Sequence, residues 1–151
     1  MNLSLQMAKH FREVFFGGNW TSVNLQQTLE GVNRQQATMQ VNGFNSIATL
    51  VYHIHYYVSV VKKVLEGEAL NASDKYSFDC PPITSEADWQ QLLEKVWSDA
   101  AAFAALVEQL PEQKMGAIFE DEKYGTYYRN IHGIIEHTHY HLGQITLIKK
   151  M

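Results

Sequence analysis

The chain of 151 residues lacks most of the signatures that would place it in a common enzyme class. It has no GxxxxGK[ST], GxGxxG or GxSxG motif, so nucleotide binding and serine-hydrolase chemistry have no support. The HExxH motif of zinc proteases is absent as well. Cysteine is almost missing, because Cys80 stands alone. No disulfide can therefore form within the chain, and we interpret Cys80 as an ordinary thiol in a reducing compartment.

Long apolar runs and concentrated charge are also missing. No segment of 18 apolar residues occurs, and the first 16 residues lack the apolar core of a signal peptide, so we expect a cytoplasmic protein without a membrane span. The formal net charge is −4, and no run of five basic residues occurs. This argues against nucleic acid as the main partner. No strand pattern is convincing, apart from a short extended piece near 38–41.

What the chain does have is apolar residues at helical spacing. It is 46% hydrophobic and 12% aromatic, which predicts one folded domain over residues 1–151. We expect helices over five segments: 3–16, Asn19 to about Gly31, 45–65, 85–110 and 127–149. The fold class is all-α, a four-helix bundle. In this interpretation the short helix over 3–16 is an extra element, packed over the mouth of the bundle or serving as a dimer arm, and Trp20, Val23 and Leu29 reach the core.

The last segment, 127–149, holds four of the seven histidines: His132, His137, His139 and His141. Only His137 and His141 are spaced i, i+4, which places two imidazoles one above the other on a helix face. At about 100° per residue, His141 lies about 50° and His137 about 90° from the centre of the apolar stripe. The other two histidines lie on the opposite flank. The pair is therefore beside the core, where helical bundles build metal sites.

A zinc or nickel site needs a third protein ligand, and the segment 45–65 offers His53 or His55. These two are i, i+2 and lie on opposite flanks of their own apolar stripe. The flank of His53 looks buried, since it carries Tyr57, Val60 and Val64. The flank of His55 looks solvated, since it carries Ser59, Lys62 and Glu66. We choose His53. The competing interpretation is that the histidines occupy the interior and bind no ion.

Two motifs resemble those of the DinB/YfiT-like family of bundle metalloproteins. Residues 50–54 read LVYHI and residues 136–145 read EHTHYHLGQI, where the family shows L-x-x-H-[IL] and H-x-x-[YF]-H-R-G-Q. The resemblance covers about 20–149 and implies an up-down-down-up bundle with a metal triad of His53, His137 and His141. One departure is Leu142, which stands where family members often carry Arg.

The resemblance also implies a function. Family members include S-transferases and isomerases that use low-molecular-weight thiols, and others are described as metal-dependent hydrolases. We therefore expect a metal-dependent enzyme, an S-transferase that uses a small thiol and a small-molecule substrate. The alternatives are a metal-dependent hydrolase and a non-catalytic metal-binding bundle. The ion would be zinc or nickel, with iron or manganese as alternatives, because imidazole suits all of these. A homodimer is expected as well.

Four further residues are candidates to orient the ring nitrogens or to line the pocket: Gln144, Asn130, Tyr57 and Tyr127. No catalytic residue is assigned. The acidic residues 120–122 precede the last helix, and we interpret them as a solvated loop rather than a general base.

The longest connection runs from 67 to 84, and such a length allows two consecutive helices to run parallel. We expect its aromatic residues, Tyr76 and Phe78, to pack within the loop rather than contact substrate.

Overall fold

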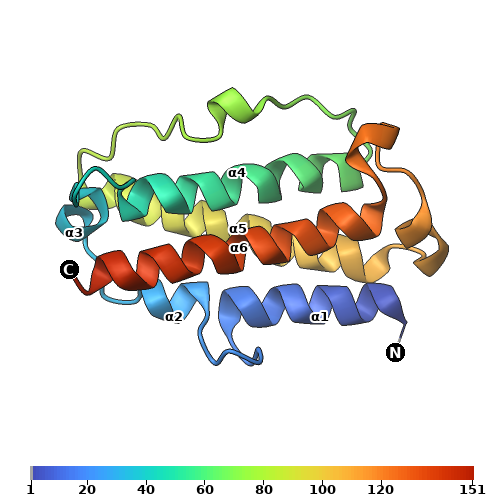
Figure 1. Ribbon diagram of the computed structural model, residues 1–151, viewed down its shortest axis with the longest axis horizontal. Helices are drawn as coiled ribbons and strands as arrows, with labels where there is room; N and C mark the ends of the chain where they lie inside the picture. Colours follow the sequence, from blue (N-terminus) through green and yellow to red (C-terminus); the bar gives the residue numbers. More distant parts are fainter. Residues whose placement is uncertain (1) are drawn as a thin grey trace.

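The computed structural model describes residues 2–151 as a bundle of helices (Figure 1). Four helices are long: α1 (Leu3–Phe16), α4 (Ile47–Leu65), α5 (Glu86–Gln109) and α6 (Tyr127–Lys149). Two are short: α2 (Leu25–Leu29) and α3 (Arg34–Thr38). Single 3₁₀ turns are η1 (Asp74–Tyr76), η2 (Glu112–Gly116) and η3 (Glu122–Tyr124). Among the described residues the only strand-like pairing is one isolated bridge, Ile118 to Thr126, so the all-α prediction is confirmed.

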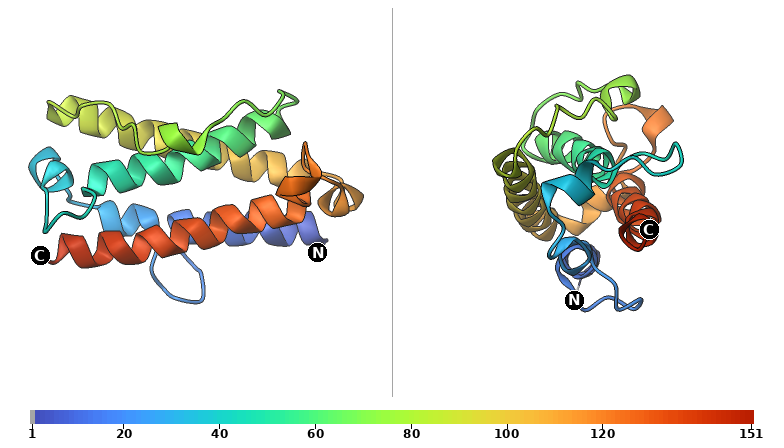
Figure 2. Two further views of the ribbon diagram at one scale, coloured as in Figure 1. Left: turned by 45° about the horizontal axis from the view of Figure 1, so that its top comes forward. Right: turned by 90° about the vertical axis from the view of Figure 1, so that its left-hand side faces the viewer.

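The four long helices run up, down, down and up. Figure 1 shows α1 and α6 running in one direction and α4 and α5 in the other. The parallel pair α4 and α5 is joined by residues 66–85, which return along the outside of the bundle. The end-on view in Figure 2 places the long helices around a common centre, with this connection outside them. The predicted topology and the predicted duty of the long connection are both confirmed.

The first member of the bundle is α1, not the helix expected from Asn19. Phe11 and Phe15 of α1 stack with their centroids 4.4 Å apart, and Phe11 meets Phe103 of α5 at 4.5 Å. All three rings are fully buried. The Ser4 hydroxyl donates to the carbonyl of Leu110 at 2.7 Å and joins the start of α1 to the end of α5. The apolar stripe of α1 is thus used inside the chain, neither as a cover nor as an arm.

The segment after α1 forms a tight loop instead of a helix from Asn19. The Asn19 side chain donates to the carbonyls of Glu13 and Val23 at 2.9 and 2.8 Å and accepts from the Thr21 amide at 2.9 Å. These bonds hold the backbone in a turn, and Trp20 projects into solvent, fully exposed. The prediction that Trp20 reaches the core is wrong, and Val23 is also exposed. Only Leu29, on α2, is buried as expected.

Local capping chemistry sets the ends of the helices that carry the site. The Ser46 hydroxyl accepts from the Thr49 amide and begins α4, and Ser85 forms a capping box with Asp88 at the start of α5. The stretch 32–44, where no helix was expected, contains α3, which Asn33 caps. None of the helices within residues 2–151 is both long and apolar enough to cross a bilayer.

Candidate metal centre

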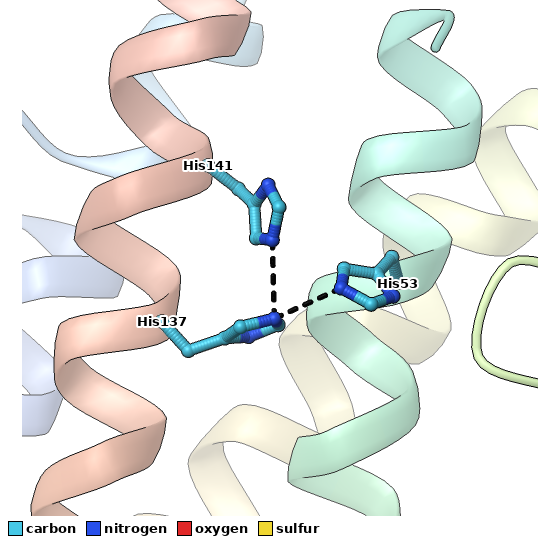
Figure 3. A group of neighbouring side chains, drawn as sticks. All are labelled: His53, His137 and His141. Carbon is cyan, nitrogen blue, oxygen red and sulfur yellow. Dashed lines mark hydrogen bonds between the residues drawn. The ribbon is translucent and has the colours of Figure 1, made fainter. Parts of the chain in front are cut away.

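Three histidines meet between α4 and α6 (Figure 3). His137 and His141 point from α6 toward His53 on α4, and candidate ligand atoms of the three rings lie within 4.8 Å of one another. The Nε2 atom of His137 is 2.9 Å from Nε2 of His53 and 3.1 Å from Nε2 of His141. The spacing of i, i+4 on α6 supplies two rings, and the antiparallel packing of α4 on α6 supplies the third. The structure thus brings together the three residues chosen from the sequence.

Each outer ring of this cluster has its proton on the side away from the centre. Nδ1 of His53 lies 3.1 Å from the Ser77 carbonyl, and Nδ1 of His141 lies 2.7 Å from Oε1 of Gln144. Both partners accept, so each Nδ1 carries the hydrogen and each neutral ring turns a lone pair at Nε2 inward. His137 can donate its own proton to at most one of them. Three converging nitrogens with too few protons between them suit a cation, so the donor set fits a divalent metal.

Burial keeps these rings in the neutral form that binds metal. Removal from water lowers the pKa of His53 and of His141 below its ordinary value. The hydrogen bonds to Ser77 and Gln144 act in the opposite direction and offset only part of this effect. Removal from water lowers the pKa of His137 to about 4, and the neighbouring rings of His141 and His53 add to the effect. His53 and His141 are buried, and His137 is half-buried. No proton has to be displaced at neutral pH before a metal binds.

The long connection covers one side of the cluster, through residues 73–78, which we call the strap. Phe78 stacks on the His53 ring with centroids 3.7 Å apart and planes 9° apart. The Tyr56 hydroxyl donates to the Ser73 carbonyl at 2.9 Å and accepts from its amide at 3.1 Å. The Tyr57 hydroxyl donates to Asp74 at 3.0 Å, and Ser77 holds His53 as described. The structure therefore places Phe78 on a candidate ligand, beyond the loop packing that was expected.

A hollow of about 640 Å³ opens beside His137, between α4 and the first half of α6. Its lining consists of Tyr57, Val61, Tyr128, Arg129, Asn130, His132, Gly133, Ile134, Glu136 and His137. Tyr57 meets the rings of His137 and His53 edge-on, at 4.9 and 5.2 Å between centroids. This hollow gives a small molecule access to the least buried of the three histidines.

The four auxiliary candidates are placed differently. Gln144 bonds His141, and Tyr57 contacts two rings of the cluster. Asn130 lines the hollow, although its side chain donates to the carbonyls of Tyr124 and Thr126 at the start of α6. Tyr127 packs edge-on against Phe119, and the structure does not bring it to the histidines.

His55 is not solvated, which corrects the prediction for its flank. Its side chain is buried against α5, where Nε2 lies 2.7 Å from a carboxylate oxygen of Asp99. Burial lowers the pKa of His55, while Asp99 raises it. Helix α5 covers this flank, and the polar residues on it serve as partners: Lys62 lies 3.7 Å from Asp99. The choice of His53 over His55 is unaffected, because His55 faces away from α6.

The remaining histidines of α6 lie outside the cluster. His132 stacks on Tyr128 with centroids 5.6 Å apart and lies 3.7 Å from Glu136. Burial lowers the pKa of His139, and His10 on α1 contributes, which places His139 toward α1. Sequence reasoning missed two contributors, the Ser77 carbonyl and Phe78. A backbone carbonyl has no sequence signal, and the only hint was the length of the connection.

Comparison with known proteins gives one family. A sequence model described as the DinB superfamily matches residues 19–145, which is most of the chain. No curated protein and no solved structure matches this chain. The matched residues include all three histidines of the cluster.

Proposed function

The chain belongs to the DinB superfamily, and we propose that it is a metal-dependent enzyme whose divalent ion is held by His53, His137 and His141. The observation that carries the proposal is the inward convergence of three Nε2 atoms beside an open hollow. Three protein ligands leave a position free, as in catalytic sites. Imidazole ligands suit zinc and nickel, with iron and manganese as alternatives.

We propose a thiol-dependent S-transferase in preference to a hydrolase. A divalent ion held there supplies Lewis acidity, which lowers the pKa of a thiol or of water and polarises a carbonyl. Hydrolysis benefits from a general base close to the ion, yet no carboxylate among residues 2–151 hydrogen bonds to the three histidines. Asp74, which influences the His53 pKa, already accepts the Tyr57 proton. A thiol has a pKa of about 8.5, whereas the pKa of water is about 15.7, so a thiol ionises without such a base.

The chain's own residues orient and shield the reaction. Ser77 and Gln144 hold two rings with their lone pairs inward. Phe78 covers one face of His53 and excludes water from it. Tyr57, fixed by Asp74, forms the wall between the cluster and the hollow through which a small molecule enters. In the transfer the thiol loses its proton to solvent, the thiolate sulfur forms a bond to an electrophilic carbon of the substrate, and the leaving group departs from that carbon with its electron pair.

Metal content of untagged protein tests the proposal. We expect close to one zinc or nickel ion per chain, and His141→Ala should lose it. His139→Ala is the matched control from the same helix and should keep it. His55→Ala should also keep it while losing stability, by about 1–3 kcal/mol, because Asp99 loses a buried partner.

Two results would contradict the proposal. An ion retained by His141→Ala would place the site elsewhere. If His141→Ala loses the ion as expected but the wild type transfers no thiol to electrophilic substrates, the protein would be a metal-binding bundle without catalysis. We further propose a small molecule rather than nucleic acid as the partner, in keeping with the net charge of −4.

A further inference from the structure

The hollow is lined by one cationic side chain, Arg129, that pairs with no carboxylate of the described residues. The other charged or titratable residues of its lining are Glu136, His132, His137, Tyr57 and Tyr128. Glu136 lies 3.7 Å from His132, an interaction that becomes an ion pair only when that ring is protonated, and its side chain is 69% exposed. Arg129 makes no ion pair with a carboxylate of residues 2–151, unlike Arg12, which is paired with Glu108. An arginine left without an anion at the edge of a hollow is a ready partner for one.

The backbone gives Arg129 a defined position. Gly125 has a φ of 75° and ends the turn before α6. A Cβ atom at Gly125 would lie 2.6 Å from Cδ of Arg129, so the arginine stem passes close over this glycine, whose positive φ also disfavours other residues. The amide of Arg129 donates to the Thr126 hydroxyl that caps the helix. Arg129 is exposed, and its stem lies along the start of α6.

The hollow connects Arg129 to the histidine cluster along one helix. His137 lies eight positions after Arg129 on α6, which corresponds to about 12 Å of axial rise. Gly133 lies between them, and a Cβ atom added there would meet nothing within 4 Å. Its missing side chain leaves the middle of the hollow open. The volume of about 640 Å³ is in the usual range for small-molecule sites.

We propose that this hollow is the binding site of an anionic co-substrate, whose carboxylate or phosphate is received by Arg129 while its reacting thiol lies at His137. The guanidinium group pairs with either anion through two parallel hydrogen bonds. The inference rests on the proposed function for its reacting end. The anion site itself is independent of that function.

Matched thiols test the inference on protein loaded with Co²⁺. The probes are 8-mercaptooctanoate and 8-mercaptooctanol, which differ in the charge at the far end, with 3-mercaptopropionate as a thiol too short to reach Arg129. The change in the Co²⁺ absorption spectrum reports binding of the thiol. We expect the long acid to bind about tenfold more tightly than the alcohol, because a hydrogen-bonded charge pair contributes that much. The short acid, 3-mercaptopropionate, should not show this tenfold gain in affinity over the alcohol.

Variants test which residues cause the difference in affinity between the acid and the alcohol. Arg129→Gln should remove the advantage of the acid and leave the alcohol unchanged, whereas Arg129→Lys should keep much of it. Gly133→Leu should weaken both long thiols, because it fills the hollow. Gly143→Leu, the same change at an exposed position of α6, should weaken neither. Cobalt content should be equal in all variants.

Failure of the inference can be distinguished from failure of the proposed function. Normal cobalt loading with equal affinity for acid and alcohol, or with no change in Arg129→Gln, would overturn the anion site alone. Absence of cobalt in the wild type would overturn the metal proposal. The hollow would then be tested on the metal-free protein with octanedioate, by amide NMR shifts at Gly133 and Tyr128. Saturable shifts lost in Arg129→Gln would support the anion site, and absence of shifts would overturn it.

Discussion

The chemistry of the cluster depends on which nitrogen of each imidazole carries its proton. His53 and His141 are each fixed by one acceptor, the Ser77 carbonyl and the Gln144 amide oxygen. His137 has only the other two rings as partners at Nε2. Two candidate ligands are therefore preorganised by their neighbours, and the third is positioned mainly by its place on α6.

Gln144 offers a direct test of this preorganisation. Gln144→Leu removes the acceptor for Nδ1 of His141, so the ring loses its preferred tautomer. We expect zinc affinity to fall by about 10–100-fold, as is typical when the hydrogen-bond partner of a metal ligand is removed. Competition with a chromophoric chelator measures it. Gln144→Glu keeps an acceptor and should retain the affinity. Equal affinities in the leucine variant and the wild type would show that Gln144 does not orient His141.

The half-buried His137 predicts a pH dependence of the metal-free protein. Its pKa falls from the ordinary value of 6.5 to about 4 on folding. Between these values the unfolded chain binds the proton and the folded chain does not, so stability decreases as the pH falls through this window. The slope is at most about 1.4 kcal/mol per pH unit for one proton.

Urea unfolding between about pH 7 and pH 5 measures that slope. His137→Gln cannot titrate in this range and should give a flatter profile than the wild type. A profile that is equally steep in both proteins would assign the pH dependence to other groups.

Reasoning about single residues from sequence succeeded for one flank of α4 and failed for the other. His53 was expected to be buried because apolar residues share its flank, and it is buried. His55 was expected to be solvated because polar residues share its flank, yet it is also buried. A polar flank can be covered when the facing helix brings a partner, and here α5 brings Asp99. Sequence alone gives no signal for such a pairing across 44 positions.

At the scale of elements, the strap and α4 form a single structural unit. Three residues of one face of α4, His53, Tyr56 and Tyr57, hold the strap through Ser77, Ser73 and Asp74. Because His53 belongs both to the cluster and to this contact, the proposed metal binding would be thermodynamically linked to docking of the strap. Each should strengthen the other.

Proteolysis tests this linkage. Tyr56→Phe removes both hydrogen bonds to Ser73, so the strap should be cut faster and zinc should bind several-fold more weakly. Added zinc should slow cleavage of the strap in the wild type. Tyr76→Phe is the matched control, since Tyr76 lies on the strap with its side chain half exposed. Zinc affinity that is unchanged in Tyr56→Phe would show that the strap and the cluster are independent.

Helix boundaries were predicted better than helix roles. Capping residues and Pro111 act on the nearest turn of backbone, so the limits of α4, α5 and α6 follow from short stretches of sequence. Which helices join the bundle depends on distant partners. The rings of α1 find Phe103, whereas the stretch around Trp20 is held as a turn by Asn19 and finds no partner in the core.

At the scale of the whole molecule, the cluster joins two helices that are far apart in sequence. His53 and His137 are separated by 84 positions, and their meeting requires α4 and α6 to be fully packed. A ligand bound only by the folded chain stabilises that chain.

We therefore expect zinc to raise the midpoint of thermal unfolding. At about 100 times its dissociation constant the gain is about 2.7 kcal/mol, which corresponds to about 5–10 °C for a chain of this size. Calorimetry measures the shift, and a chelator should reverse it. His137→Gln should show little shift, and a shift as large as that of the wild type would mean that the ion binds elsewhere. The homodimer stays a prediction, and sedimentation equilibrium would measure it.

The sequence by itself determined the four long helices and the candidate ligands. Helical periodicity, caps and the i, i+4 histidine pair are local, because each depends on residues within a few turns of helix. The apolar flank of the segment 45–65 selected His53 as the third histidine, and the two DinB-like motifs agreed with that choice and added the topology. The tertiary structure alone decided what surrounds them: the strap over His53, the burial of His55 and the hollow between His137 and Arg129. These features depend on which surfaces come into contact after the chain has folded, and no local sequence pattern predicts those contacts.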